Sequence, residues 1–260
     1  MSAPLDPPRP AATLIIFRQP KGEQAQVLML VRGSTMRFAG GACVFPGGGV
    51  DEADRQLAAT LPAPTGWDGH DDMAARIAAI RETLEETGLA IGLTRRDGRR
   101  IGADDAAEAR AMLTRSLALA PVLGHMGWAL DAAALTPFAR WCPRLPRPYD
   151  TRFYLADLGT GAVALAPDAG ESESLLWVTP GQALDQADAG DLSLLFPTRR
   201  NLERLAQFSG FGETRRHALA TPLDTITPRI IERDGQSWLT FPTGLGYPVV
   251  EQPLDQARRQ

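Results

Sequence analysis

The chain has 260 residues, of which 44% are hydrophobic and 22% are charged, a composition typical of globular proteins with a sizeable core. Its formal net charge of −4 excludes a broad basic surface, so we expect no binding to long nucleic acids. The two cysteines, Cys43 and Cys142, exclude a disulfide framework and favour a reducing compartment. Because no apolar run approaches the roughly 18 residues of a membrane-spanning helix, we expect no membrane partner and a cytoplasmic location.

The N-terminal part of the chain predicts two strands and a glycine-rich loop. Residues 1–10, which are rich in proline, are expected to be a loose tail, and residues 11–260 a single domain. Two apolar runs separated by a polar turn predict strands over Ala12–Arg18 and Gln26–Arg32. The loop from Arg37 to Asp51 is rich in glycine, so its backbone can approach a ligand closely. We interpret residues 52–70, which have weak periodicity, as an insertion.

The remainder of the chain alternates strands with helices. An alanine-rich helical pattern over Asp104–Ala118 continues in broken form, which predicts a helical addition over residues 104–134. Strands are expected over Phe138–Cys142, Tyr149–Leu155 and Ser174–Val178, and helices over Pro180–Ala187, Thr198–Phe208 and Glu213–Leu219. The pair Asp234-Gly235 is a strong turn signal, so a closing hairpin is predicted from Ile226–Arg233 and Trp238–Phe241.

The helix of greatest interest is predicted over Asp71–Thr87, since acidic residues begin it and Gly88 follows its end. At about 100° per residue, three carboxylates share one arc of this helix: Glu82, Glu85 and Glu86. The opposite arc is apolar, and small side chains flank the acids: Met73, Ile77, Ile80 and Leu84 form the apolar stripe, and Ala75, Ala78 and Ala79 the flanks. One face therefore suits the core, and the other can lie close to a ligand.

The simplest alternative is a surface helix whose acids are merely solvated. However, like charges four residues apart destabilise a helix by about 0.2–0.5 kcal/mol. Glu85 and Glu86 also lie at the helix C-terminus, where the helix dipole disfavours anions. A divalent cation prefers carboxylate oxygens and would remove this repulsion. The pattern therefore favours a metal site.

The run Arg81-Glu82-x-x-Glu85-Glu86-x-Gly88-Leu89 resembles the second half of the Nudix box, and Phe45 to Asp51 resembles the Gly-Gly-x-x-acid loop that opens it. In the usual box, a glutamate follows a glycine six residues on. We place Met73 at this glutamate position, with the insertion before it, so that one metal ligand is lost. Asp71 and Asp72 are candidates to replace it, although both also suit helix capping.

The resemblance implies an α/β (α+β) fold of the Nudix type, a mixed β-sheet sandwiched between α-helices, here with extra helical insertions. It implies metal-dependent cleavage of a phosphoanhydride in a nucleoside diphosphate derivative, with Mg²⁺ or Mn²⁺ as the cofactor. Carried over residue by residue, the metal ligands are Glu82, Glu85 and Glu86. The catalytic group is Arg81, Glu82 and Glu86, in which Glu82 orients or deprotonates water and Arg81 holds a glutamate by a charge-assisted pair.

The same resemblance assigns residues outside the helix. Gly47 and Gly48 would let the loop backbone approach the substrate. Many Nudix enzymes take a further carboxylate from a later loop, and Glu171 and Glu173 are the candidates here. The alternative for these two is that they are solvated loop acids.

The substrate prediction comes from residues 28–48, which are similar to the signature of Nudix coenzyme A diphosphatases, with Leu30 and Gly33 as departures. The matching residues are Arg32, Arg37, Gly41, Phe45, Pro46, Gly47 and Gly48. Later segments, residues 135–141, 148–154 and 196–202, resemble a longer subfamily with a split box that includes the peroxisomal coenzyme A diphosphatases.

Two arginines suit a ligand with an extra anionic group, such as the 3′-phosphate of coenzyme A, because guanidinium binds phosphate in a bidentate manner. The alternative is that both arginines only meet solvent at a strand end. The resemblances imply coenzyme A or acyl-coenzyme A as the substrate, cut to 3′,5′-ADP and a 4′-phosphopantetheine.

Other functions are also compatible with the sequence. A Nudix hydrolase can act on ADP-ribose, NADH, a dinucleotide polyphosphate or a nucleotide sugar, and a Nudix module can bind a nucleotide without catalysis. A serine hydrolase is not indicated, because the chain has no Gly-x-Ser-x-Gly motif. We expect a small-molecule nucleotide as the partner, and a homodimer is compatible with the sequence.

Overall fold

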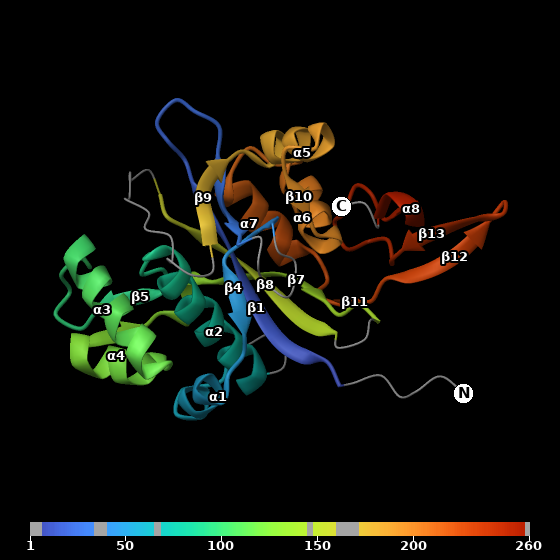
Figure 1. Ribbon diagram of the computed structural model, residues 1–260. Coiled ribbons are helices and arrows are strands. Elements are labelled where there is room, and N and C mark those ends of the chain that lie inside the picture. Colours follow the sequence, from blue (N-terminus) through green and yellow to red (C-terminus); the bar gives the residue numbers. More distant parts are fainter. Residues whose placement is uncertain (1–6, 34–40, 65–68, 145–147, 160–171, 258–260) are drawn as a thin grey trace.

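The computed structural model describes residues 7–33, 41–64, 69–144, 148–159 and 172–257 (Figure 1). At its centre lies a mixed β-sheet with the strands β1 Arg9–Arg18, β2 Gln26–Arg32, β3 Ala42–Val44, β4 Gly47–Gly49, β7 Thr136–Trp141, β8 Tyr149–Asp157, β9 Ser172–Val178, β10 Ser193–Leu194 and β11 Thr225–Ile226. The strand order is β10-β3-β2-β1-β8-β7-β11, with β4 paired to β1 and β9 paired to β2. The longer strands predicted from the sequence are present, with ends shifted by a few residues.

Strand β1 lies in the middle of the sheet, antiparallel to β2 and parallel to β8. Successive side chains of a strand point to opposite faces. Accordingly, Leu14 and Ile16 join one hydrophobic cluster, and Ile15 and Phe17 join the other. All four side chains are buried, so the apolar run that predicted this strand supplies both faces of the sheet with core.

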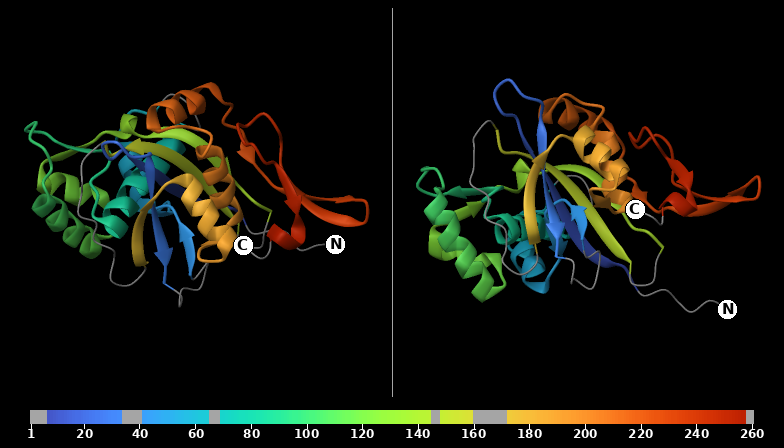
Figure 2. Two further views of the ribbon diagram at one scale, coloured as in Figure 1. Left: turned by 90° about the horizontal axis from the view of Figure 1, so that it is seen from above. Right: turned by 45° about the horizontal axis from the view of Figure 1, so that its top comes forward.

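Helices cover both faces of the sheet (Figure 2). One face carries α1 Glu52–Ala59, α2 His70–Thr87, α3 Ala103–Ser116 and α4 Leu119–Met126, and the other carries α5 Pro180–Ala189, α6 Phe196–Leu205 and α7 Phe211–Ala220. Ile77 of α2 and Leu202 of α6 are fully buried on opposite sides of the sheet. The mixed sheet between two layers of helices confirms the predicted fold class.

Helix α1 departs from the sequence prediction, which assigned residues 52–70 to an insertion. Glu52 and Asp54 stand in its first turn, where the helix dipole favours acidic side chains. Asp54 and Ala58 are buried, and Ala58 belongs to the same hydrophobic cluster as α2. The chain then reaches α2 through residues 60–69, of which 65–68 lie outside the described residues. The additional chain between the two halves of the box therefore follows α1.

The segment predicted as a helical addition contains α3, α4 and a short 3₁₀ helix, Ala132–Ala134. Its strand β6 Trp128–Leu130 pairs with β5 Leu93–Arg95, which precedes the segment, in a small two-stranded sheet that the sequence pattern did not indicate. Ala109, Leu113 and Val122 are fully buried in the cluster that also holds α2. The addition is thus packed onto the helix that carries the acids.

The C-terminal part forms a second sheet from β12 Arg229–Arg233, β13 Gln236–Thr240 and β14 Glu251–Pro253, followed by the short α8 Leu254–Ala257. Asp234 and Gly235 both adopt positive φ, as the predicted hairpin turn requires, and β12 and β13 project from the body (Figure 1). Ile226 belongs to β11 and not to this hairpin. In the described part of the chain, no helix combines the length and apolar character needed to cross a bilayer.

Candidate active site

Helix α2 presents its faces as the sequence pattern predicts. Ile77, Ile80 and Leu84 are fully buried against the sheet. The helix ends at Gly88, whose φ of 75° is the left-handed conformation that glycine adopts without strain. On the acidic arc, the side chain of Glu82 is 17% exposed and that of Glu85 is 30% exposed. The acids therefore lie at a sheltered surface.

Arg81 is the central cation of the site. Its Nε and Nη2 donate to the two carboxylate oxygens of Asp54, each over 3.0 Å, and its Nη1 donates to Oε1 of Glu82 over 2.7 Å. Nη2 also donates to the carbonyl oxygen of Gly49 over 2.9 Å. Burial disfavours the charged guanidinium, but its hydrogen bonds to Asp54 and the nearby carboxylates outweigh burial and raise the pKa of Arg81. Arg81 thus ties α1, β4 and α2 together.

Asp54 corrects our placement of the box acid. Met73 is 7% exposed and belongs to the hydrophobic core, whereas Asp54 is 1% exposed and pairs with Arg81. Asp54 stands six residues after Gly48, which is the spacing of the box glutamate. Sequence reasoning missed it because we counted backward from Arg81, across the additional chain. Counting forward from the glycine would have found it.

Asp72 does not replace a lost ligand either. Its carboxylate is fully buried, and it accepts hydrogen bonds from Tyr154 Oη over 2.6 Å and from Arg76 Nε over 2.7 Å. Arg76 in turn donates to the carbonyl oxygens of Ala132 and Leu135. These contacts join α2 to the helical addition and to β8, so Asp72 has a structural role. Asp71 is exposed in the first turn of the helix.

The glycine loop lies against the acidic arc of α2. The backbone N–H of Gly47 donates to Oε2 of Glu86 over 2.9 Å. Gly48 lies directly over Glu82, so that a Cβ at this position would overlap the carboxylate. Burial raises the pKa of Glu82 to about 7, although Arg81 acts in the opposite direction. The loop and the helix thus enclose two carboxylates, Glu82 and Glu86.

The variant Gly48→Ala should lower the catalytic rate without destabilising the fold. The added methyl group forces the flexible Glu82 side chain aside while the backbone can stay in place. We expect the free energy of unfolding to change by less than about 1 kcal/mol, and kcat to fall about a hundredfold because the carboxylate is misplaced. Gly49→Ala is the matched control, because its Cβ would meet no described atom within 4 Å. Equal kcat values for the two variants would contradict the prediction.

The other predicted site residues are placed only in part. Arg32 is half-buried at the end of β2, and its Nε is buried with no hydrogen-bond partner among the described residues. Arg37 and Glu171 lie outside the described residues. Glu173 lies in β9, but its side chain is also outside them. The structure therefore brings Arg81, Gly47, Gly48, Glu82 and Glu86 together, and it leaves the later acids untested.

The carboxylates fit a hard divalent cation in their chemistry. Glu82 and Glu86 offer oxygen ligands, which Mg²⁺ and Mn²⁺ prefer. Burial raises the pKa of Glu82, and a bound cation would favour its charged form. Over the described ranges, no group of three or more His, Cys, Asp or Glu side chains converges on one point. Glu82 and Glu86 are instead turned toward Arg81 and Gly47.

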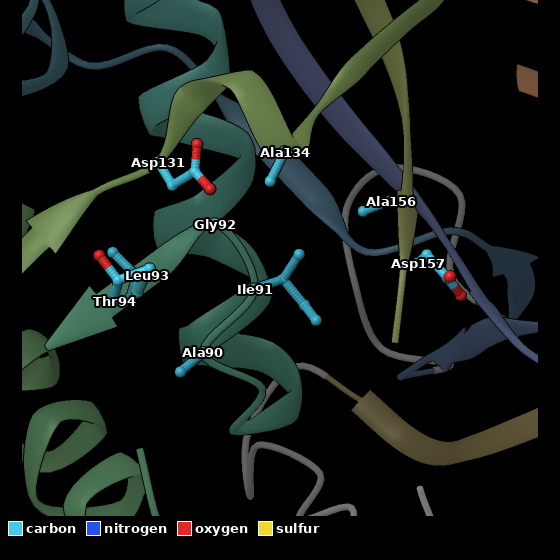
Figure 3. Close-up of a pocket in the computed structure, with 9 residues that line it drawn as sticks. All are labelled: Ala90, Ile91, Gly92, Leu93, Thr94, Asp131, Ala134, Ala156 and Asp157. Carbon is cyan, nitrogen blue, oxygen red and sulfur yellow. The ribbon is translucent and has the colours of Figure 1, made fainter. Parts of the chain in front are cut away.

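A cavity of about 240 Å³ lies next to the C-terminal end of α2 (Figure 3). The segment Ala90–Thr94, which follows the helix, forms one wall, and Asp157 at the end of β8 lies across from it. Asp131 also lines the cavity, and the side chain of Ile91 points from its wall toward the side of Asp157. None of the box acids lines this cavity, so it is distinct from the site around Arg81.

Known proteins are similar to this chain in sequence and fold, although no protein-family model matches it. A Caenorhabditis elegans protein provisionally named nudix hydrolase 7 is 29% identical over 90% of this chain and 74% of its own length. The acyl-coenzyme A diphosphatase NUDT19 of Gallus gallus is 30% identical over 72% of this chain and 63% of its own length. A crystal structure of a Nudix hydrolase from Alicyclobacillus acidocaldarius matches 85% of this chain and 99% of its own, at 29% identity and a TM-score of 0.69.

The fold, the split box around Arg81 and these relatives agree on the class of protein, a phosphoanhydride hydrolase. In sequence and fold the chain is similar to Nudix hydrolases over most of its length, and these homologues and structural neighbours indicate a pyrophosphohydrolase.

Proposed function

We propose that the protein hydrolyses the phosphoanhydride of coenzyme A or acyl-coenzyme A to 3′,5′-ADP and an (acyl-)4′-phosphopantetheine, with Mg²⁺ or Mn²⁺ as the cofactor. The observation that carries this proposal is the position of Arg32. Its carbonyl oxygen accepts from Gly41 N–H over 3.0 Å at the base of the glycine loop, and its buried Nε has no partner among the described residues. A substrate phosphate would satisfy that donor. The name of the Gallus gallus relative supports the same substrate.

In this proposal, Glu82, Glu85 and Glu86 hold the cation, which when bound supplies charge neutralisation for the phosphates and activates a water molecule. Glu82 accepts from Arg81 at Oε1, and we assign Oε2 to orienting the water or taking its proton. Glu86 is held at Oε2 by the N–H of Gly47, which keeps the glycine loop beside the acids. Arg81 is the positioning residue, because it fixes Glu82 through a charge-assisted hydrogen bond.

The same proposal includes four further assignments. These are a further acid from Glu171 or Glu173, the contact of Arg37 with substrate, a homodimer and a cytoplasmic location. Arg37 lies five residues beyond Arg32 in the sequence and is the first residue of the glycine loop, within the segment similar to coenzyme A diphosphatases. We assign both arginines to the 3′-phosphate, since two guanidinium groups suit a doubly charged anion.

The comparison of coenzyme A with dephospho-coenzyme A tests the substrate assignment. Removing the 3′-phosphate should lower kcat/KM at least about tenfold, because hydrogen bonds between charged groups are lost. Arg32→Gln should reduce kcat/KM for coenzyme A and narrow the difference between the two substrates. Arg229→Gln, an exposed arginine on the β12 strand, is the control and should leave the difference unchanged. Equal kcat/KM values for both substrates in the unmodified protein would contradict the proposal.

A further inference from the structure

The helical addition contacts the end of α2 that carries the acids (Figure 1). Ala109 and Leu113 of α3 are fully buried in the same hydrophobic cluster as Ile80 and Leu84 of α2. This packing fixes α3 along the last two turns of α2. The residue after Ala109 is Arg110, which the box does not include.

Arg110 reaches the C-terminal backbone of α2. Its Nε donates to the carbonyl oxygen of Glu85 over 2.7 Å, and its Nη2 lies 3.5 Å from the carbonyl oxygen of Glu86. The last four carbonyl groups of a helix have no partner in a following turn. The last bond of this pattern in α2 is the one that the carbonyl of Leu84 accepts from Gly88 N–H over 3.0 Å. The next N–H, that of Leu89, donates to Oγ1 of Thr87 and leaves the helix pattern. Arg110 therefore donates to carbonyl oxygens that lie beyond the last hydrogen bond of the helix pattern.

The charges explain why a guanidinium stands here. The C-terminus of a helix carries a partial negative charge, and two glutamates in the last turn add to it. A cation that binds the carbonyl oxygens offsets both effects. Arg110 thus keeps the last turn of α2 helical, and with it the directions in which the Glu85 and Glu86 side chains leave the backbone.

We propose that Arg110 is a positioning residue for the cation site, and that the helical addition thereby sets the affinity for the divalent metal. This inference rests on the proposed function, because it takes Glu85 and Glu86 as metal ligands. In this proposal Arg110 acts through the backbone of these ligands, whose carbonyl oxygens it contacts. Groups that orient metal ligands usually change metal affinity about tenfold or more when they are removed.

The test is a Mn²⁺ titration of the full-length protein without substrate, in which electron paramagnetic resonance reports the free Mn²⁺. Arg110→Ala should weaken Mn²⁺ binding about tenfold. Arg110→Lys keeps the charge but not the forked set of donors, so its Mn²⁺ affinity should lie between those of the unmodified protein and Arg110→Ala. Arg115→Ala is the matched control, since Arg115 is exposed on the same helix and its removal changes the net charge equally. The Mg²⁺ concentration for half-maximal turnover should shift in parallel, with kcat largely recovered at saturating Mg²⁺.

Three results separate the possibilities. Mn²⁺ affinity that is unchanged or tighter in a folded Arg110→Ala variant would overturn the inference, and so would an equal loss in Arg115→Ala. If Arg110→Lys has a lower melting temperature but an unchanged Mn²⁺ affinity, Arg110 has only a structural role, and this result would also overturn the inference. No Mn²⁺ binding by the unmodified protein would instead contradict the proposed metal dependence itself.

Discussion

Glu82→Gln should lower kcat about a thousandfold and leave the protein folded. Glutamine has the same shape and can still accept the hydrogen bond from Arg81 Nη1, so the packing around the site is kept. It cannot take a proton from water and binds a divalent cation weakly, so the two functions assigned to this carboxylate are lost together. The loss should appear in kcat at saturating Mg²⁺ with the substrate concentration well above KM.

The folded state of Glu82→Gln should be at least as stable as that of the unmodified protein, although its kcat is lower. Burial raises the pKa of Glu82 to about 7, so the cost of charging this carboxylate in the folded state grows as the pH rises from the ordinary glutamate range to about 7 and is fully present above it. The neutral amide has no such cost. In metal-free buffer at pH 8, we therefore expect the free energy of unfolding of Glu82→Gln to equal or exceed that of the unmodified protein.

Glu108→Gln is the matched control for this variant, because Glu108 is exposed on α3. Both its kcat and its free energy of unfolding should stay close to those of the unmodified protein. Full turnover by Glu82→Gln would refute the assigned role of Glu82. A large loss of stability would show that the loss of kcat reflects unfolding.

Asp54→Asn should cost about 3 kcal/mol of unfolding free energy, because it removes the charge that pairs with a buried guanidinium. The side chains of Asp54 and Arg81 are 1% and 4% exposed, so water cannot replace the lost partner. Chemical denaturation measures the effect. A decrease in kcat should accompany it, since Arg81 also holds Glu82.

Asp51 provides a matched comparison for Asp54, because its carboxylate also lies beside the guanidinium of Arg81. Asp51 lies 3.3 Å from Arg81 Nη2, but its side chain is 62% exposed. Asp51→Asn should therefore change the free energy of unfolding by less than about 1 kcal/mol, although the chemical change and the partner are identical. Equal losses from the two variants would mean that the buried pair with Asp54 does not hold the two halves of the box together.

Much of the fold could be predicted because its elements follow simple periods. The buried strands β1 and β2 are continuous apolar runs, and α2 alternates a core stripe with an acidic arc. Strands of two or three residues, such as β4 and β10, are too short to show a period, and their positions are fixed by tertiary pairing. The sequence pattern also missed helix α1, whose eight residues are followed by a proline-containing segment that suggested a loop.

The site was predictable where its residues lie on one helix and was not where they meet across the chain. Glu82 and Glu86 follow from the spacing of the box. The pairing of Asp54 with Arg81 spans 27 residues, and the contact of Arg110 with Glu85 spans 25. Such contacts depend on how α1 and α3 pack on α2, which local spacing does not encode.

The most direct test of the proposed activity is a product analysis by mass spectrometry. The protein is incubated with Mg²⁺ and, separately, coenzyme A, acetyl-coenzyme A, ADP-ribose, NADH and a diadenosine polyphosphate. We predict that coenzyme A yields 3′,5′-ADP and 4′-phosphopantetheine in equal amounts and faster than any substrate without a 3′-phosphate is cleaved. Intact coenzyme A in a reaction that cleaves one of the other nucleotides would contradict the proposed substrate.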